Sequence, residues 1–333
     1  MRDFKRSIFF TKTPIKGYYR YKDVFQIFPC NLEDTPSSKY QKHFPNILEY
    51  WIEPDEIINF AKDFDELNNL VNFTGTSILK QDKYLSLLTA FTNNHFFRYF
   101  DTTGSWGMPM LKDDPGKEAN TWSSKWCLPL FHSPDLAEQL RIENFSNQDL
   151  PEIERLEDKV YFMQNPNLDN DSKIPITFPK SIDNIFNSYF SLNPNELKFV
   201  DPAIDFNLAA VELKDIRKTL SLLSSFTAVE TMIELEYMHK SVERCSTCGQ
   251  LKYSISRKFR EYLLKYIGNT ENNKKKFNSF YSIRSKIAHT GQQLFTERLF
   301  SDVPKDIGEK EFITRLEILQ MGRLAIYNWL HDK

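Results

Sequence analysis

Glycine and long apolar runs are scarce in this chain, which has only 10 glycines in 333 residues. Scarce glycine argues against a glycine-rich phosphate cradle and against an all-β protein full of tight turns. No segment approaches the roughly 18 uninterrupted apolar residues of a membrane span. The charged N-terminus and the short apolar run of residues 8–10 do not make a secretory signal. The sequence therefore predicts a cytoplasmic protein that makes no membrane contact.

Several catalytic signatures are also missing. The chain has no Walker A sequence, no Gly-x-Ser-x-Gly elbow, no His-Glu-x-x-His pair and no dinucleotide fingerprint. Nor does it show a carboxylate cluster of the kind that metal-dependent nucleases use. In a reducing compartment the 4 cysteines are expected to be thiols or metal ligands rather than disulfides.

What the chain does contain is apolar and aromatic bulk. Its hydrophobic fraction is 41%, with 28 Phe and 15 Tyr, which is enough for sizeable cores in two domains. Alternating and aromatic runs predict strands at residues 7–12 and 18–28, and an apolar stripe predicts a helix over residues 54–70. A polar, turn-forming stretch at residues 164–173 reads as an exposed linker or a long loop.

The second half of the chain has a helical pattern. Helices are expected at about residues 203–223, 224–240, 254–267, 274–288 and 310–330, and short connections favour antiparallel neighbours. We therefore predict an α+β fold that is predominantly α. A mixed α/β domain occupies residues 1–190, and an up-and-down helical bundle occupies residues 200–333.

Positive charge is concentrated in one block. The formal net charge of the chain is -2, but residues 240–290 contain 12 Lys and Arg against 3 Glu, a net of +9. Such a block indicates either a contact with a polyanion or a solvated helix face. The cations of this block that we expect to contact a polyanion are Lys274, Lys275, Lys276, Lys286 and Arg257.

Within this block, one arginine lies on the wrong face of its helix. Arg284 follows Phe277 by seven residues and Phe280 by four, so it falls in the apolar stripe. Burial of a guanidinium is costly unless the group is paired. Glu230 lies in the inward stripe of an earlier helix, and we expect the two side chains to form an ion pair. The pair either only fixes helix register or orients an Arg whose fork faces a phosphate.

His289 follows Arg284 by five residues. On an ideal helix this spacing places the two side chains about 140° apart. They converge only if the helix frays or tightens at its end, which Thr290 and Gly291 permit. A histidine at a helix end is otherwise a surface residue stabilised by the helix dipole.

Three segments carry a resemblance to a known family. They are Phe280-Tyr-Ser-Ile-Arg-Ser-Lys-Ile-Ala-His-Thr-Gly291, Phe226-Thr-Ala-Val-Glu-Thr-Met-Ile233 and Tyr253-Ser-Ile-Ser-Arg-Lys-Phe259. The first resembles the Arg-x4-His signature of HEPN domains, in the form Tyr-x-x-Arg-Ser-x-x-x-His of the Apea-like branch. The resemblance covers about residues 200–333. The chain departs from the common pattern at two positions. Ser285 stands where active members of the wider family often have Asn, Asp or His, and Thr290 separates the His from the Gly.

The resemblance implies a metal-independent endoribonuclease that works as a homodimer, with two motifs facing each other across the two-fold axis. Arg284 and His289 are then catalytic, with Glu230, Ser285 and Tyr281 in support. An imidazole can move a proton near neutral pH, and a guanidinium can stabilise a charged phosphorane. The expected products carry a 2′,3′-cyclic phosphate and a 5′-OH. The same resemblance implies that the protein acts as a toxin or an antiviral effector.

Two questions stay open at this point. The first is whether the domain cleaves RNA or is a non-catalytic helical dimer that binds RNA or a nucleotide. In either case, residues 1–190 are expected to sense, target or inhibit, with a regulatory partner. The second concerns the Cys-x2-Cys pair of Cys245 and Cys248. The pair either binds zinc together with His239, or lies in a plain turn between helices, or is a redox pair. No cofactor is expected apart from this zinc.

Overall fold

A computed structural model describes residues 3–30, 43–58, 65–98, 143–164, 174–238, 255–298 and 302–333. The chain divides into two compact units, Met1–Met163 with Asp169–Lys180, and Ser181–Lys333 with Gln164–Leu168. The predicted linker at residues 164–173 lies almost wholly outside the described residues. Within the described ranges, no helix is both long and apolar enough to cross a membrane.

The first unit is built on an antiparallel sheet. Its strands are β1 (Asp3–Thr11), β2 (Tyr19–Tyr21), β3 (Phe25–Pro29) and β4 (Phe44–Ile52), in the order β1-β4-β3-β2. The run at residues 18–28, predicted as one strand, is a hairpin. Lys22 adopts a positive φ of 47° in its turn, and Tyr21 pairs with Phe25 directly beside that turn.

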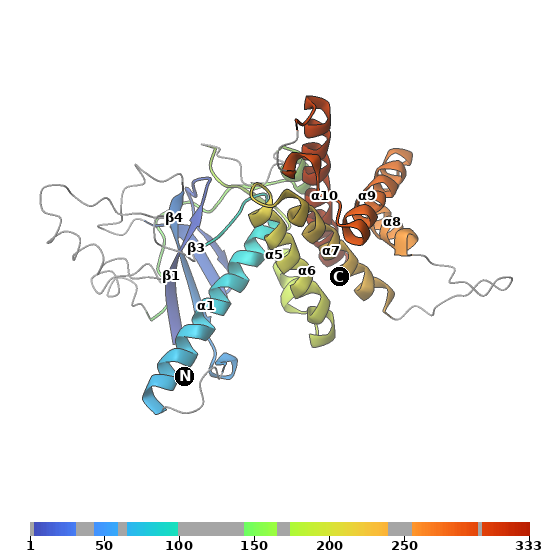
Figure 1. Cartoon of the computed structure of the whole chain (residues 1–333). Helices are drawn as coiled ribbons and strands as arrows, with labels where there is room; N and C mark the ends of the chain where they lie inside the picture. Colours follow the sequence, from blue (N-terminus) through green and yellow to red (C-terminus); the bar gives the residue numbers. More distant parts are fainter. Residues whose placement is uncertain are drawn as a thin grey trace, which may run out of the picture. The chain divides into compact units, whose positions relative to one another are not determined.

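Helix α1 (Asp65–Phe91) packs on this sheet (Figure 1). Its Tyr84 ring lies 5.0 Å from that of Phe25 and 5.6 Å from that of Tyr50. The prediction of a helix beginning at Pro54 was wrong, because Pro54–Glu56 forms only one 3-10 turn, η2. After that turn the backbone N–H of Ile58 donates to the hydroxyl of Thr76 instead of continuing a helix.

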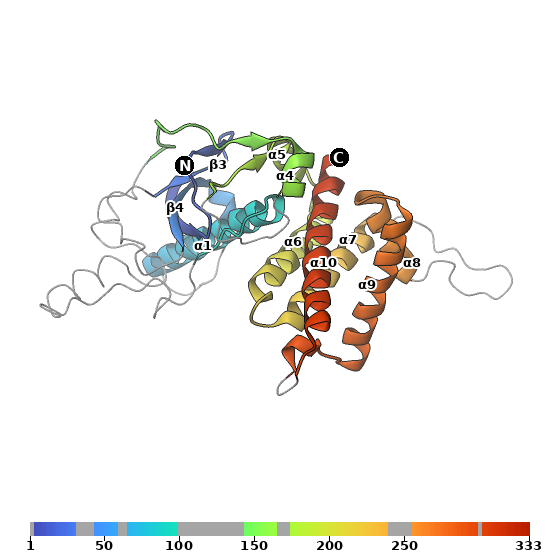
Figure 2. The same ribbon diagram turned by 90° about the horizontal axis from the view of Figure 1, so that it is seen from above.

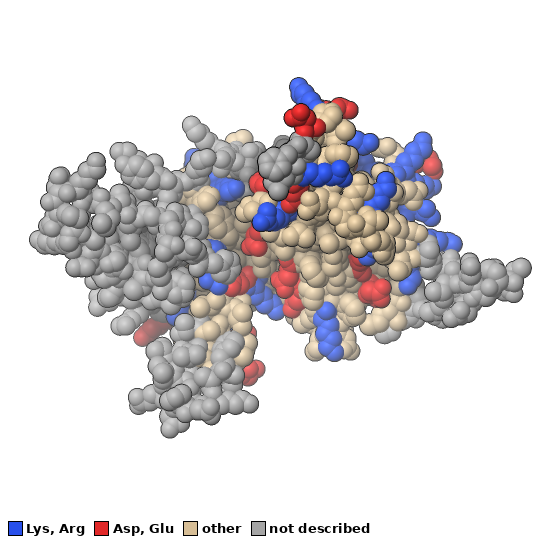
Figure 3. Space-filling view, viewed as in Figure 1, with Lys and Arg blue, Asp and Glu red and all other residues tan. Residues whose placement is uncertain are grey.

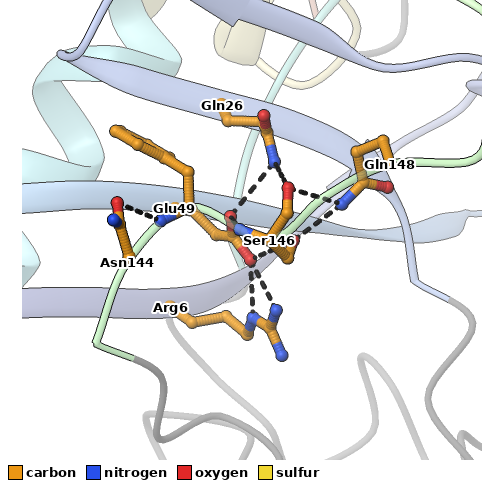
Figure 4. A network of polar contacts seen from close by, with 7 residues as sticks. Arg6, Gln26, Glu49, Asn144, Ser146 and Gln148 are labelled. Atoms are coloured by element: carbon orange, nitrogen blue, oxygen red, sulfur yellow. Dashed lines mark hydrogen bonds and ion pairs between the residues drawn. The ribbon is translucent and has the colours of Figure 1, made fainter.

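A buried carboxylate fastens a later segment onto the sheet (Figure 4). Glu49 in β4 is completely buried, and its Oε1 accepts hydrogen bonds from Nη2 of Arg6 at 2.6 Å and from the hydroxyl of Ser146 at 2.8 Å. Its Oε2 accepts from the backbone N–H of Ser146 at 2.9 Å and from Gln26 at 3.2 Å. These bonds satisfy the buried charge and fix the chain where it re-enters the described structure at residue 143. The unit also contains β5 (Arg155–Leu156), parallel to β6 (Phe178–Pro179), and α4 (Asp158–Gln164).

The second unit consists of packed helices. They are α5 (Ile182–Phe190), α6 (Pro194–Leu213), α7 (Lys218–Tyr237), α8 (Ile255–Tyr266), α9 (Glu271–Thr290), the 3-10 turn η3 (Phe295–Glu297) and α10 (Lys305–His331). Helix α7 contacts α6, α8, α9 and α10, and its buried residues include Phe226, Val229 and Ile233. Helices α8 and α9 lie side by side in both views (Figures 1 and 2). The predicted α+β class, predominantly α, is confirmed.

Helices α6 and α7 differ from their predicted bounds. The break between them falls at residues 214–217, not at residue 223. Helix α6 begins at Pro194 because the side chain of Asn193 caps the backbone N–H groups of Asn195 and Glu196. Pro202 lies inside α6, so the helix begins nine residues before the predicted start at about residue 203. Helix α5 belongs to the same unit, since the division falls between Lys180 and Ser181.

Candidate functional site

The centre of the candidate site is an ion pair between α7 and α9. Nη2 of Arg284 donates a 2.8 Å hydrogen bond to Oε2 of Glu230, and its Nε lies 2.7 Å from Oε1. The side chains are only 20% and 22% exposed, respectively. The ion pair expected from the two apolar stripes is therefore present. Within the described part of the chain, Nη1 of Arg284 has no hydrogen-bond partner.

Helix α9 presents His289 to solvent. The helix starts at the cap residue Thr270, whose hydroxyl accepts from the N–H of Asn273, and ends at Gly291, which has a φ of 65°. It stays α-helical through Thr290, because the N–H of Gly291 still donates to the carbonyl of Ile287. The helix end therefore does not fray, and His289 and Arg284 project about 140° apart in one protomer. His289 is exposed, with no partner among the described residues.

Two supporting residues have different surroundings. Tyr281 is half-buried, and its ring lies 5.8 Å from that of Phe259 on α8, which lies 6.1 Å from Phe226 on α7. This aromatic row joins the three helices that carry the candidate motifs. Ser285 is half-buried beside Arg284 in the chain.

Three of the five cations predicted to hold RNA are already paired. Lys274 contacts Glu271 at 2.7 Å, Lys276 contacts Glu317 on α10 at 2.5 Å, and Arg257 contacts Glu261 at 2.6 Å. Lys275 and Lys286 are exposed, and their ammonium groups have no ion-pair partner within the described ranges. Lys and Arg side chains nevertheless predominate over the ends of α8 and α9 in the space-filling view (Figure 3).

A groove lies between α9, α10 and η3 and has a volume of about 430 Å³. Lys286, Ser279 and Ser282 of α9 line one side of it, and Lys310 of α10 lines the other. The predictions from sequence missed Lys310, which falls outside the basic block of residues 240–290. The spacing of Ser279, Ser282 and Lys286 at i, i+3 and i+7 is the signal that could have placed them on one helix face.

A second cavity, of about 710 Å³, lies among the ends of α6, α7, α8 and α10. One of the lysines that line it, Lys265, is neutralised: its Nζ lies 2.9 Å from Oε1 of Glu236 and also donates to the hydroxyl of Tyr266 at 2.8 Å. The same hydroxyl donates to Oε2 of Glu236 at 2.9 Å. Burial, together with this bond to a carboxylate, raises the pKa of Tyr266 to about 12.

The candidate zinc ligands Cys245, Cys248 and His239 lie outside the described residues. Among the side chains that are described, no group of three or more His, Cys, Asp or Glu is placed to hold a metal ion.

Chemically, the site offers a guanidinium fixed by Glu230, whose Nη1 has no hydrogen-bond partner among the described residues, and an exposed imidazole on the same helix. These are a phosphate ligand and a proton carrier. Comparison of the chain with protein-family models, with curated proteins and with solved structures gives no match.

Proposed function

We propose that the helical unit is an Apea-like HEPN ribonuclease domain, and that the protein is a metal-independent endoribonuclease acting as a homodimer in the cytoplasm. The observation that carries the proposal is the Arg284–Glu230 pair. It holds a guanidinium at the same end of α9 as the exposed His289 and leaves Nη1 without a partner among the described residues. An ion pair that only fixed the register of α7 and α9 would have the same geometry. The test of the proposal is therefore RNA cleavage itself.

The proposed reaction uses the nucleophile that RNA carries. The 2′-OH loses its proton to an imidazole and attacks the adjacent phosphorus, and the bond from phosphorus to the 5′-oxygen breaks. The 5′-oxygen takes a proton, so the products are a 2′,3′-cyclic phosphate and a 5′-OH. Arg284 stabilises the charge on the phosphorane oxygens. Lys275 and Lys286 hold the flanking phosphates, since both are exposed and have no ion-pair partner in the described structure.

The positions of the two motif residues support a dimer. In one protomer, Arg284 points towards α7 while His289 lies about 140° around the helix and faces solvent. Two copies of α9 packed about a two-fold axis would place two imidazoles and two guanidinium groups along one groove. The unit that contains the sheet would then regulate or target cleavage, in keeping with a toxin or an antiviral effector.

Cleavage is tested with purified full-length protein and single-stranded RNA in EDTA. Wild type should cut the RNA, and His289→Ala should lower the rate by about 10²-fold or more. His331→Ala is the matched control, because His331 is another exposed histidine at a helix end. This variant should cleave RNA at the wild-type rate. Circular dichroism checks that each variant is folded. If wild type cuts nothing, or if His289→Ala cuts at the wild-type rate, the proposed activity is wrong.

A non-catalytic dimer that binds RNA or a nucleotide is the second candidate. It is favoured by one observation: no described residue hydrogen-bonds to His289 to orient its imidazole. In that case the protein retains RNA in a gel-shift assay without cutting it. Arg284→Met then weakens retention, whereas His289→Ala does not.

A further inference from the structure

We infer that the groove between α9, α10 and η3 binds one nucleotide of the RNA next to the scissile phosphate. The inference rests on the proposed function for the identity of the ligand. Its location, however, comes from the groove itself, which contains neither Arg284 nor His289.

The charges of the groove select an anion. Lys286 and Lys310 line it from opposite helices, and neither ammonium group has an ion-pair partner among the described residues. One carboxylate, that of Glu311, also lines the groove. Both of its oxygens are engaged by η3, since Oε1 accepts from the N–H of Phe295 at 2.7 Å and Oε2 accepts from the N–H of Thr296 at 3.0 Å. The two lysines are therefore available to a phosphate.

The rest of the lining suits the base of a nucleotide. Leu222, Ile287 and Leu294 give the groove an apolar floor, and the ring of Phe295, 38% exposed, lies at its edge. Neutral hydrogen-bonding side chains surround this floor: Ser279, Ser282, Gln292, Gln293 and Thr314. An aromatic ring offers a stacking surface to any base, and amides and hydroxyls can bond to base edges. The volume of about 430 Å³ falls in the range of roughly 300–1,000 Å³ that is usual for small-molecule sites.

The position of the groove connects it to the motif. Lys286 precedes His289 by three residues on α9, so the two side chains are neighbours along the exposed side of one helix. A strand whose phosphate lies at His289 would reach Lys286 with the next phosphate and place a base between α9 and η3. The occupant is thus a single-stranded segment, because a base in a duplex is not free to enter a groove of this kind.

The test is a binding experiment with full-length protein and uncleavable 2′-O-methyl oligonucleotides, one carrying its bases and one with abasic residues of the same length. Wild type should bind the base-bearing probe about fivefold or more tightly than the abasic probe. Ser279→Phe fills the groove from an exposed helix position and should abolish this difference. Phe295→Ala should reduce it.

The role of charge is tested separately with Lys310→Gln. This variant should bind both probes more weakly and lower the slope of log Kd against log salt concentration by about one. Lys305→Gln is the matched control, because Lys305 is an exposed cation of the same helix that does not line the groove, and it should bind as wild type does. The inference is overturned if wild type does not distinguish the two probes, or if Lys310→Gln binds no more weakly than Lys305→Gln. If wild type does not cleave RNA but still binds the base-bearing probe more tightly, only the ribonuclease proposal is refuted.

Discussion

Loss of the Glu230 carboxylate should destabilise the helical unit by a measurable amount. Glu230→Gln keeps the shape of the side chain but leaves the Arg284 guanidinium, 20% exposed, without its counter-charge. A hydrogen bond to a charged group contributes about 1.5–3 kcal/mol. The energy of a partly buried ion pair lies between that of an exposed pair and that of a buried one. We therefore expect the free energy of unfolding to fall by about 2 kcal/mol. For a unit of this size that is a decrease in Tm of roughly 4–8 °C.

The assay is a double-mutant cycle of Glu230→Gln and Arg284→Met, with urea unfolding followed by far-ultraviolet circular dichroism. Arg284→Met retains the apolar stem, so the cycle isolates the coupling between the two charged groups. Glu271→Gln serves as the control. Glu271 and its partner Lys274 are 81% and 41% exposed, so its effect should stay below about 0.5 kcal/mol. A coupling energy between Glu230 and Arg284 below about 0.3 kcal/mol would show that the pair does not hold Arg284 in place.

The remaining predictions concern the rest of the chain. The folded protein holds the proton of Tyr266, whose pKa is about 12, more tightly than the unfolded chain, whose tyrosine pKa is 10.0. The free energy of unfolding should therefore fall as pH rises from about 10 to 12, and Tyr266→Phe should flatten that curve in urea titrations. Gly17→Ala should lower Tm, because its Cβ would come within 2.5 Å of a backbone carbonyl oxygen. Gly308→Ala, with no neighbour closer than 3.7 Å, should raise Tm or leave it unchanged. Glu49→Gln should cost about 3–5 kcal/mol in urea unfolding, since Glu49 is completely buried and paired; a loss below about 1 kcal/mol would contradict that role.

The helical half of the fold could be predicted where local signals agreed with packing. The 3.6-residue pattern gave α8 and α9 to within three residues at each end, and Gly291 ended α9 as expected. The pattern failed between α6 and α7. There the chain turns at residues 214–217 without glycine or proline. The apolar periodicity therefore continues through the turn and does not reveal where one helix ends and the next begins.

The sheet was harder to read because its pairings are long-range. Strand β4 pairs Ile47 with Ile8 and Phe28, which lie far away in the chain, so no local pattern reveals the partners. Likewise, Pro54–Glu56 has the features of a helix start, but the backbone N–H of Ile58 bonds to Thr76, eighteen residues further along the chain, and the helix stops after one turn.

At the candidate site, the placement of Arg284 in an apolar stripe was enough to predict its partner, because a buried charge needs a counter-charge and Glu230 lies in the facing stripe. The state of the lysines could not be predicted in the same way. Lys276 is neutralised by Glu317, which lies 41 residues away on α10, whereas its neighbour Lys275 has no ion-pair partner among the described residues. Which cation of a run is available depends on the packing of a distant helix.

The most direct test of the ribonuclease proposal is the chemistry of the RNA ends that wild type produces in EDTA. Mass spectrometry of a cleaved oligonucleotide should show a 2′,3′-cyclic phosphate on one fragment and a 5′-OH on the other. A single 2′-deoxy substitution at the scissile position should block the cut. Fragments with a 5′-phosphate, or cleavage that survives the 2′-deoxy substitution, would contradict a mechanism in which Arg284 and His289 act on the 2′-OH of the substrate.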